Sequence, residues 1–181
     1  MEKDNINLWK NAMNFGAVGG VTIAVFRFIS TLSNATFSGI SILRYVILAM
    51  LIIKGTKFLR DKLENGNIKY SRALSSGILI SLFAGIIIGF YVIIEFQYIK
   101  PELMQEYIIL QEEAVMKMTW FPEEQIEEQI NRIHQKASPV KYGSEEILNN
   151  TLWGLIMSVI IAIFLKKDNP FADYKEINET T

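Results

Sequence analysis

The chain has 181 residues, a formal net charge of −1 and no cysteine. A net charge near zero excludes a broadly basic surface, so nucleic acid is not expected as a partner. The lack of cysteine excludes disulfides, thiolate zinc sites and a cysteine nucleophile. Hydrophobic residues make up 50% of the chain, but the charged residues gather in a few segments. The length of each uncharged stretch is therefore more informative than the average composition.

The first long apolar region, residues 11–53, contains only two charged residues, Arg27 and Arg44. It is too long for one membrane-spanning helix and suits two, because one span needs about 20 residues. A cluster of polar residues at 31–36 predicts the break between them. The predicted first and second spans are residues 11–32 and 37–53. A cleavable signal peptide in place of the first span is disfavoured, because the apolar region is longer than a signal core and contains Arg27.

Two further apolar stretches, residues 73–94 and 147–165, predict a third and a fourth span. The first of these would be about 33 Å long as a helix, which matches the hydrocarbon core of a bilayer. Three of the four spans carry small residues at every fourth position, a spacing that lets another helix approach closely. The residues of these stripes are Gly16, Gly20, Gly77, Ser81, Gly85, Gly89, Gly154 and Ser158. We expect packing within one bundle; the alternative is a homodimer formed through one of the stripes.

The connection at residues 54–72 carries six cations and two acids. Because loops rich in Lys and Arg stay in the cytoplasm, we expect this loop and both termini on the cytoplasmic side. Four of its cations, Lys54, Lys57, Arg60 and Lys62, are candidates for binding anionic lipid headgroups. The alternative is that they only fix the orientation of the chain.

The longest polar segment, residues 95–146, contains eleven glutamates and five cations, a net charge of −6, and the predicted topology places it outside the cytoplasm. Its apolar periodicity predicts two amphipathic helices separated near Pro122. A disulfide-free segment of this length seldom folds alone. We therefore expect residues 101–137 to contact the membrane surface, a second copy of the chain, or a membrane or periplasmic partner protein.

Three charged residues, Arg27, Arg44 and Glu95, are predicted to lie in the outer half of the bilayer. Charges in a membrane are costly unless they are paired or hydrated, so we expect Glu95 to pair with one of the two arginines. The functional interpretation is an anion or substrate site that opens outward. The structural interpretation, which we favour, gives these charges a role in the bundle or at its surface.

The sequence offers little support for metal binding or catalysis. Glu127, Asn131 and His134 could share one face of the second outer helix, but a solvated helix face explains them better. The chain has no Ser-His-Asp order, no phosphate-binding glycine loop and no HExxH motif. We therefore expect no enzymatic activity and no cofactor.

Several residues in the middle of the chain also occur as a pattern in a known family. They are Lys57, Arg60, Asp61, Gly66, Ile68, Tyr70, Ala73 and Gly77, followed by Tyr98 and Pro101. In this pattern and in its hydropathy over residues 10–167, the chain resembles the domain of unknown function 4199 family. The resemblance implies a small, uncharacterised inner-membrane protein of Bacteroidota with four spans. It implies no activity or binding site.

Together these patterns predict an all-α integral membrane four-helix bundle, with an extracytoplasmic amphipathic helical hairpin between spans three and four. The location that we expect is the bacterial inner membrane. The absence of catalytic motifs and the amphipathic hairpin favour a non-enzymatic protein that assembles with itself or with a partner. The alternative is a small oligomeric transporter or channel that uses Arg27, Arg44 and Glu95.

Overall fold

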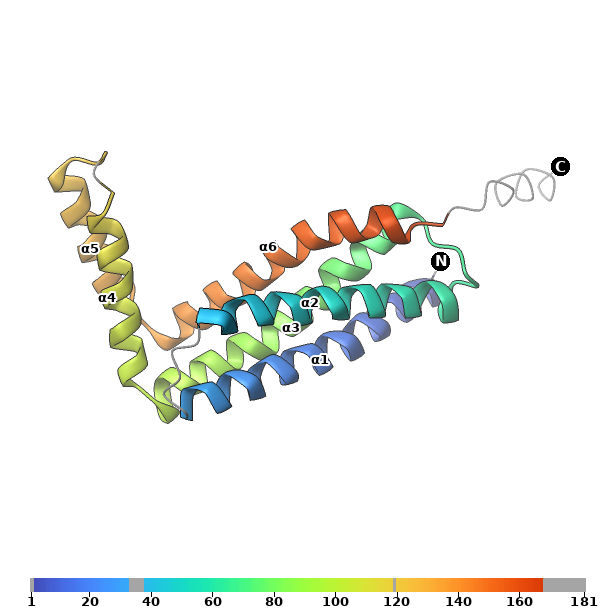
Figure 1. The fold of residues 1–181 in the computed structure, drawn as a ribbon, viewed down its shortest axis with the longest axis horizontal. Coiled ribbons are helices and arrows are strands. Elements are labelled where there is room, and N and C mark those ends of the chain that lie inside the picture. The colour runs from blue at the N-terminus through green and yellow to red at the C-terminus, as the bar shows by residue number, and fades with distance from the viewer. Residues whose placement is uncertain (1, 33–37, 119, 168–181) are drawn as a thin grey trace.

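The computed structural model describes residues 2–32, 38–118 and 120–167, and it is all-helical, as Figure 1 shows. The helices are α1 (Glu2–Leu32), α2 (Ser38–Phe58), α3 (Tyr70–Ile94), α4 (Glu102–Met116), α5 (Glu123–Lys136) and α6 (Pro139–Leu165). Two π-helical segments, Leu59–Leu63 and Glu95–Ile99, continue α2 and α3. Extended pairing within the described ranges is limited to one bridge between Ile68 and Lys167. The predicted all-α fold class is therefore confirmed.

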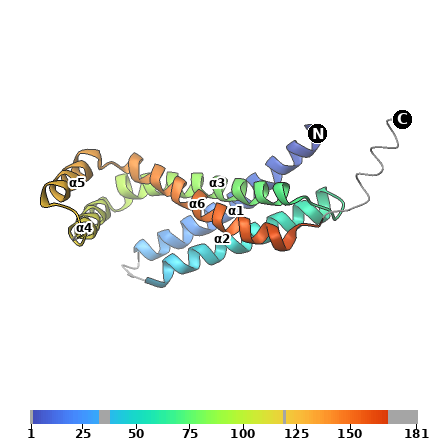
Figure 2. The same cartoon turned by 90° about the horizontal axis from the view of Figure 1, so that it is seen from above.

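Four of the helices run alongside one another, with α3 in contact with α1, α2 and α6 (Figures 1 and 2). The α4–α5 hairpin stands at one end of this bundle, and the start of α1 and the end of α6 lie at the other (Figure 1). The loop between α2 and α3 also lies at this second end. There, the backbone N–H of Ile68 donates to the carbonyl of Lys167 at 3.0 Å, and the reverse bond has the same length. This pair of bonds holds the loop against the end of α6.

Three helices in the described part of the chain are long and apolar enough to cross a membrane: Ile6–Leu32, Tyr70–Ile99 and Pro139–Leu165. Large apolar side chains on the outside of the bundle are exposed, as a lipid-facing surface requires; examples are Val21, Ile42, Phe90, Leu148 and Phe164. These features indicate a membrane protein. The predicted second span falls in α2, and its crossing of the membrane stays a prediction, as does the orientation of the chain. The predicted break at 31–36 lies mostly outside the described residues.

Among the described residues, the core of the bundle consists of three clusters along its length. The cluster near the end of α6 contains Leu8, Leu59, Ile68, Ala73 and Ala162. The middle cluster contains Ala12, Leu48, Ile52, Ile80 and Ala84. The cluster at the hairpin end contains Ile23, Ile88, Val92, Phe96, Ile108 and Tyr142. Because Ile108 belongs to α4, this last cluster joins the hairpin to the bundle.

The helices extend beyond the apolar runs that predicted them, and α6 shows why. Its apolar run starts near residue 147, but the helix starts at Pro139, where the hydroxyl of Ser138 accepts a hydrogen bond from the Lys141 backbone N–H at 3.1 Å. A serine cap and a proline at the first position are common helix starts. Hydropathy locates the membrane-embedded part of a helix, whereas capping residues set its end. The additional two turns carry Tyr142, Glu145 and Glu146 to the hairpin end of the bundle.

Candidate functional site

Glu95 lies at the point where α3 passes into its π-helical segment, and its side chain is completely buried. Its Oε2 accepts a hydrogen bond from Arg27 Nε at 2.7 Å. Its Oε1 accepts from the hydroxyl of Thr31 at 2.6 Å and from the hydroxyl of Tyr91 at 3.1 Å. Both oxygens of the buried carboxylate are thus satisfied, as a charge removed from water requires. Glu95 therefore forms its ion pair with Arg27 and not with Arg44.

Thr31 and Tyr91 were not among the residues singled out from the sequence. Thr31 follows Arg27 by four residues, and Tyr91 precedes Glu95 by four. Residues four apart share a helix face. Helix periodicity could therefore have predicted Thr31 and Tyr91 as neighbours of the ion pair, once Arg27 and Glu95 were known to face the inside of the bundle.

Arg44 on α2 forms an ion pair with Glu146 on α6, and the two side chains are each 15% exposed. The Arg44 guanidinium carbon also lies 5.1 Å from the centre of the Tyr45 ring. Glu146 is the last residue before the predicted fourth span, which placed it in the polar segment rather than in the bundle. The early start of α6 brings it into contact with Arg44. Sequence reasoning missed this partner because it drew the helix boundary too late.

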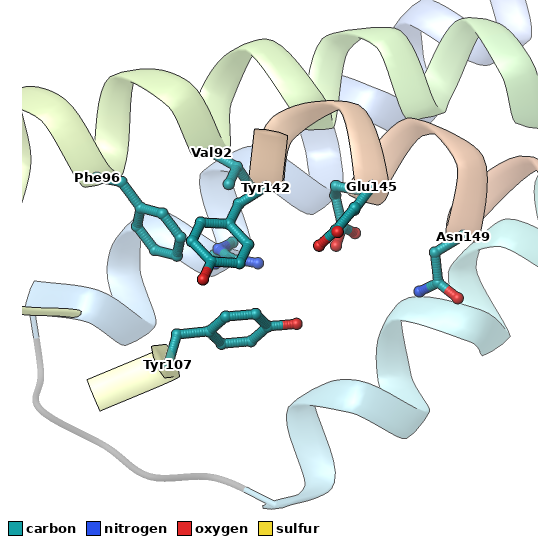
Figure 3. Close-up of a pocket in the computed structure, with 8 residues that line it drawn as sticks. Val92, Phe96, Tyr107, Tyr142, Glu145 and Asn149 are labelled. Atoms are coloured by element: carbon teal, nitrogen blue, oxygen red, sulfur yellow. The ribbon is translucent and has the colours of Figure 1, made fainter. Parts of the chain in front are cut away.

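A partly open cavity of about 250 Å³ lies between the hairpin and the bundle. Figure 3 shows its lining, which comes from α1, α3 with its π-helical segment, α4 and α6. The lining residues are Arg27, Val92, Phe96, Tyr107, Tyr142, Glu145, Glu146 and Asn149. One member of each ion pair, Arg27 and Glu146, therefore faces this cavity. The three predicted charges belong to one end of the bundle, in two pairs next to a shared cavity.

Three aromatic rings on one side of the cavity contact one another. The ring centres of Tyr107 and Tyr142 are 5.1 Å apart at an angle of 80°, and those of Phe96 and Tyr142 are 5.8 Å apart at 79°. Edge-to-face contacts of this kind are favourable. Tyr107 is 45% exposed, and the partial burial of its side chain raises the pKa of its hydroxyl; the charges of Glu146 and Glu145 raise this pKa further. The two carboxylates thus act on the same phenol across the cavity.

The small residues predicted as packing stripes face other helices of the same chain. On the α3–α6 interface, Gly77 faces Ser158, and Gly154 faces Ser81. Asn150 Nδ2 donates to the Ser81 carbonyl at 2.7 Å in the same interface. The α1 glycines, Gly16 and Gly20, face α3: added Cβ atoms would lie 2.8 Å and 2.9 Å from α3 carbonyl oxygens. A homodimer through these residues would have to displace a neighbouring helix of the chain.

The four cations singled out in the basic loop do not share one environment. Lys54, Lys57 and Lys62 are exposed, whereas Arg60 Nε lies 2.6 Å from an Asp61 carboxylate oxygen. This hydrogen bond lowers the pKa of the Asp61 carboxyl group. Lipid binding by these cations stays a proposal, and the three lysines are the members free to turn toward headgroups.

The metal interpretation of the second outer helix gains no support. His134 Nε2 contacts a Glu112 carboxylate oxygen on α4, which turns it toward the neighbouring helix. Glu127 and Asn131 line a shallow hollow with three other polar residues of α5. In the described ranges, no group of three or more His, Cys, Asp or Glu residues could hold a metal ion. His134 therefore links α4 to α5.

Comparison with known proteins identifies the family but no characterised relative. A family model described as "Protein of unknown function (DUF4199)" matches residues 14–167. No curated protein and no solved structure matches the chain. The family match covers all of α2, α3 and α6, both halves of the hairpin and most of α1. The chain therefore belongs to the DUF4199 family of proteins of unknown function.

Proposed function

We propose that this chain is a non-enzymatic inner-membrane protein that assembles with a second copy or with another protein through the α4–α5 hairpin. The observation that carries the proposal is a set of large apolar side chains exposed on α4 and in the turn after it, which we call the α4 face. Its residues and their exposed fractions are Ile109 53%, Leu110 60%, Met116 53%, Trp120 74% and Phe121 43%. Large exposed apolar side chains, with Trp among them, are typical of protein interfaces.

The hairpin itself has little to hold it in place. In α4 the only buried residue is Ile108, and α5 has none. A helical pair with so small a core gains most of its stability from what it contacts. Ile108 and the cavity-lining Tyr107 attach the base of α4 to the bundle, while the α4 face stays exposed. A partner that covers this face would supply the burial that the hairpin lacks.

The proposed topology has four membrane crossings, by α1, α2, α3 and α6, with both termini and the basic loop in the cytoplasm. The hairpin then lies on the outer side, because it stands at the opposite end of the bundle from the start of α1, the end of α6 and the basic loop (Figure 1). The charge distribution supports this orientation, since the loop at 54–72 carries six cations and the outer segment has a net charge of −6. Single-cysteine variants of this cysteine-free chain test it. An impermeant maleimide should label Glu128→Cys but not Lys62→Cys in intact cells, and the reverse pattern contradicts the proposal.

The assembly proposal is tested by the native mass of the tagged protein, solubilised gently from its own membrane. We expect a complex larger than one chain, reduced to a single chain by the double substitution Leu110→Gln and Trp120→Gln. The matched control is Glu128→Gln with Arg132→Gln, which alters an exposed ion pair on α5. A complex of whole multiples of this chain indicates self-assembly, and an additional mass indicates a partner. A single chain from the unmodified protein contradicts both.

A small oligomeric transporter or channel is the weaker proposal. Its proposed residues, Arg27, Arg44 and Glu95, each have an ion-pair partner within the chain. In a pair held in this way, each charge compensates the other inside the bundle, and this structural role accounts for all three residues. Flux in proteoliposomes that is lost in Arg44→Gln would favour transport over assembly.

A further inference from the structure

The cavity between hairpin and bundle has an unsatisfied polar group in its wall. Tyr142 is 3% exposed, lines the cavity, and its hydroxyl has no hydrogen-bond partner among the described residues. A buried hydroxyl without a partner costs free energy, so such groups commonly mark a place where a ligand or water binds. The cavity, about 250 Å³, is slightly below the size of pockets for drug-sized ligands, about 300–1,000 Å³. It therefore suits one small chemical group.

The charges that face the cavity favour a cation. Two carboxylates, Glu145 and Glu146, and one guanidinium, Arg27, belong to its lining. The Arg27 charge is offset by the buried carboxylate of Glu95, which it contacts at 2.7 Å. An anion in this place would face two carboxylates without an uncompensated positive charge. A cation would gain chiefly from Glu145, because Glu146 is paired with Arg44.

The aromatic rings in the cavity wall favour an organic cation over a metal ion. Tyr107, Tyr142 and Phe96 present aromatic surface beside the carboxylates (Figure 3). Aromatic faces attract ammonium groups, and rings arranged around a site are the usual means of binding alkylammonium ligands. Metal ions prefer several oxygen or nitrogen ligands instead, and of the two carboxylates among the described lining residues, Glu146 is already paired with Arg44.

The chain contains an ammonium group in a comparable setting. Lys141 Nζ lies 5.2 Å from the centre of the Tyr142 ring and 3.5 Å from a Glu145 carboxylate oxygen. The side chains of Lys141 and Glu145 are 28% and 48% exposed, and pairs as exposed as this contribute little to stability. An incoming ammonium group can therefore replace Lys141 as the partner of Glu145. Glu146 is less available because it is held by Arg44.

We propose that this cavity binds an organic ammonium group, with Glu145 as its counter-ion, the rings of Tyr107 and Tyr142 as its walls, and the Tyr142 hydroxyl as a polar contact. The group can belong to a water-soluble amine or to the headgroup of a zwitterionic lipid, since the cavity lies at an end of the bundle. Because Tyr107 belongs to α4 and the other lining residues to the bundle, the bound group would contact both.

The test uses the full-length protein in nanodiscs of phosphatidylglycerol, which has no amine. In one arm choline and ethanolamine are titrated by calorimetry; in the other, phosphatidylethanolamine is added to the nanodiscs and the retained lipid is identified by native mass spectrometry. Saturable binding in the first arm identifies a soluble amine. Retention in the second arm alone identifies a lipid headgroup.

In whichever arm shows binding, Glu145→Gln and Tyr107→Leu should each weaken it about tenfold, and Tyr107→Phe should leave it nearly unchanged. Glu113→Gln is the matched control, because Glu113 also forms a 3.5 Å pair with a lysine four residues away and does not line the cavity. Absence of binding in both arms overturns the proposal. Undiminished binding by Glu145→Gln, or saturable binding of inorganic phosphate in place of the amines, also overturns it.

Discussion

In α3, ten residues are buried, seven of which are Gly, Ala or Ser, whereas α4 buries only Ile108 and α5 buries none. The α3 residues are small because they allow the backbones of α1 and α6 to approach, and in a membrane close packing takes the place of the hydrophobic driving force. The hairpin, in contrast, keeps large apolar side chains and leaves many of them exposed. The helices of the bundle bury their packing surfaces against one another, whereas the hairpin leaves much of its apolar surface exposed. A change in the bundle should therefore affect folding, and a change on the hairpin should affect contacts with other molecules.

The largest effect on stability is expected from Glu95→Gln. The substitution leaves the Arg27 guanidinium, which is 30% exposed, without its counter-charge, and removes one acceptor from a network of three donors. Loss of one partner of a buried pair costs about 3–5 kcal/mol, and the partial exposure of Arg27 reduces this to about 2–3 kcal/mol. Thermal unfolding in detergent measures it. The double variant with Arg27→Gln should recover part of the loss, and Glu145→Gln is the exposed control. An unfolding temperature equal to that of the original chain would show that the pair does not hold α1 to α3.

A smaller loss is expected from Gly89→Ala at the α3–α6 interface. An added Cβ would lie 2.6 Å from the carbonyl oxygen of Gly143, and the reciprocal contact at Gly143 is 2.7 Å. Both contacts involve backbone oxygens, so the helices themselves must separate, at a cost of about 1–3 kcal/mol. The control is Phe90→Ala, which removes a much larger side chain that is 62% exposed. If Phe90→Ala destabilises the protein as much as Gly89→Ala, close helix approach is not what stabilises the bundle.

The sequence predicted the helical class and the apolar stretches well, because an uncharged run of about 20 residues has few alternatives to a membrane helix. It also brought Arg27 and Glu95 together as candidates, since two charges at similar depth in a membrane are expected to pair. It could not choose between Arg27 and Arg44, because that choice depends on which helices are neighbours. The structure places α3 against α1 at Arg27, and α6 beside α2 at Arg44.

The cavity could not be predicted from the sequence for a different reason. Tyr107 lies on α4, Tyr142 and Glu145 on α6, and Phe96 after α3. Helix periodicity shows which residues of one helix share a face, but not where two helices of different direction meet. The start of α6 at Pro139 also carries Tyr142 and Glu145 on a helix that the apolar run did not predict. A site made by helix ends depends on capping and on the angle between helices.

On the hairpin, Leu110→Gln should change the stability of the single, dissociated chain by no more than about 0.5 kcal/mol, because Leu110 is 60% exposed and exposed positions have small effects. The same substitution should weaken assembly, since a polar amide would replace an apolar side chain in the proposed interface. Thermal unfolding of the dissociated chain and the native mass of the gently solubilised protein separate the two effects. Ile108→Gln is the contrasting variant at a buried position two residues away, 5% exposed, and should reduce stability markedly. Equal destabilisation by both variants would mean that the α4 face is already covered within the chain.

The smallest expected effect is a dependence of the unfolding temperature on alkaline pH, caused by Tyr107 where the hairpin meets the bundle. Burial, followed by the charges of Glu146 and Glu145, raises the pKa of Tyr107 above its usual value of 10.0. Above pH 10 the unfolded chain releases this proton while the folded chain retains it, so the stability supplied by the neutral phenol declines as the pH rises through the folded-state pKa. Below pH 10 the group is protonated in both states and adds no slope. The unfolding temperature of Tyr107→Phe should therefore fall less steeply above pH 10 than that of the original chain. Tyr98→Phe, at a position 73% exposed, is the control, and an identical slope for all three proteins would mean that the hairpin does not hold Tyr107 against the acidic side of the cavity.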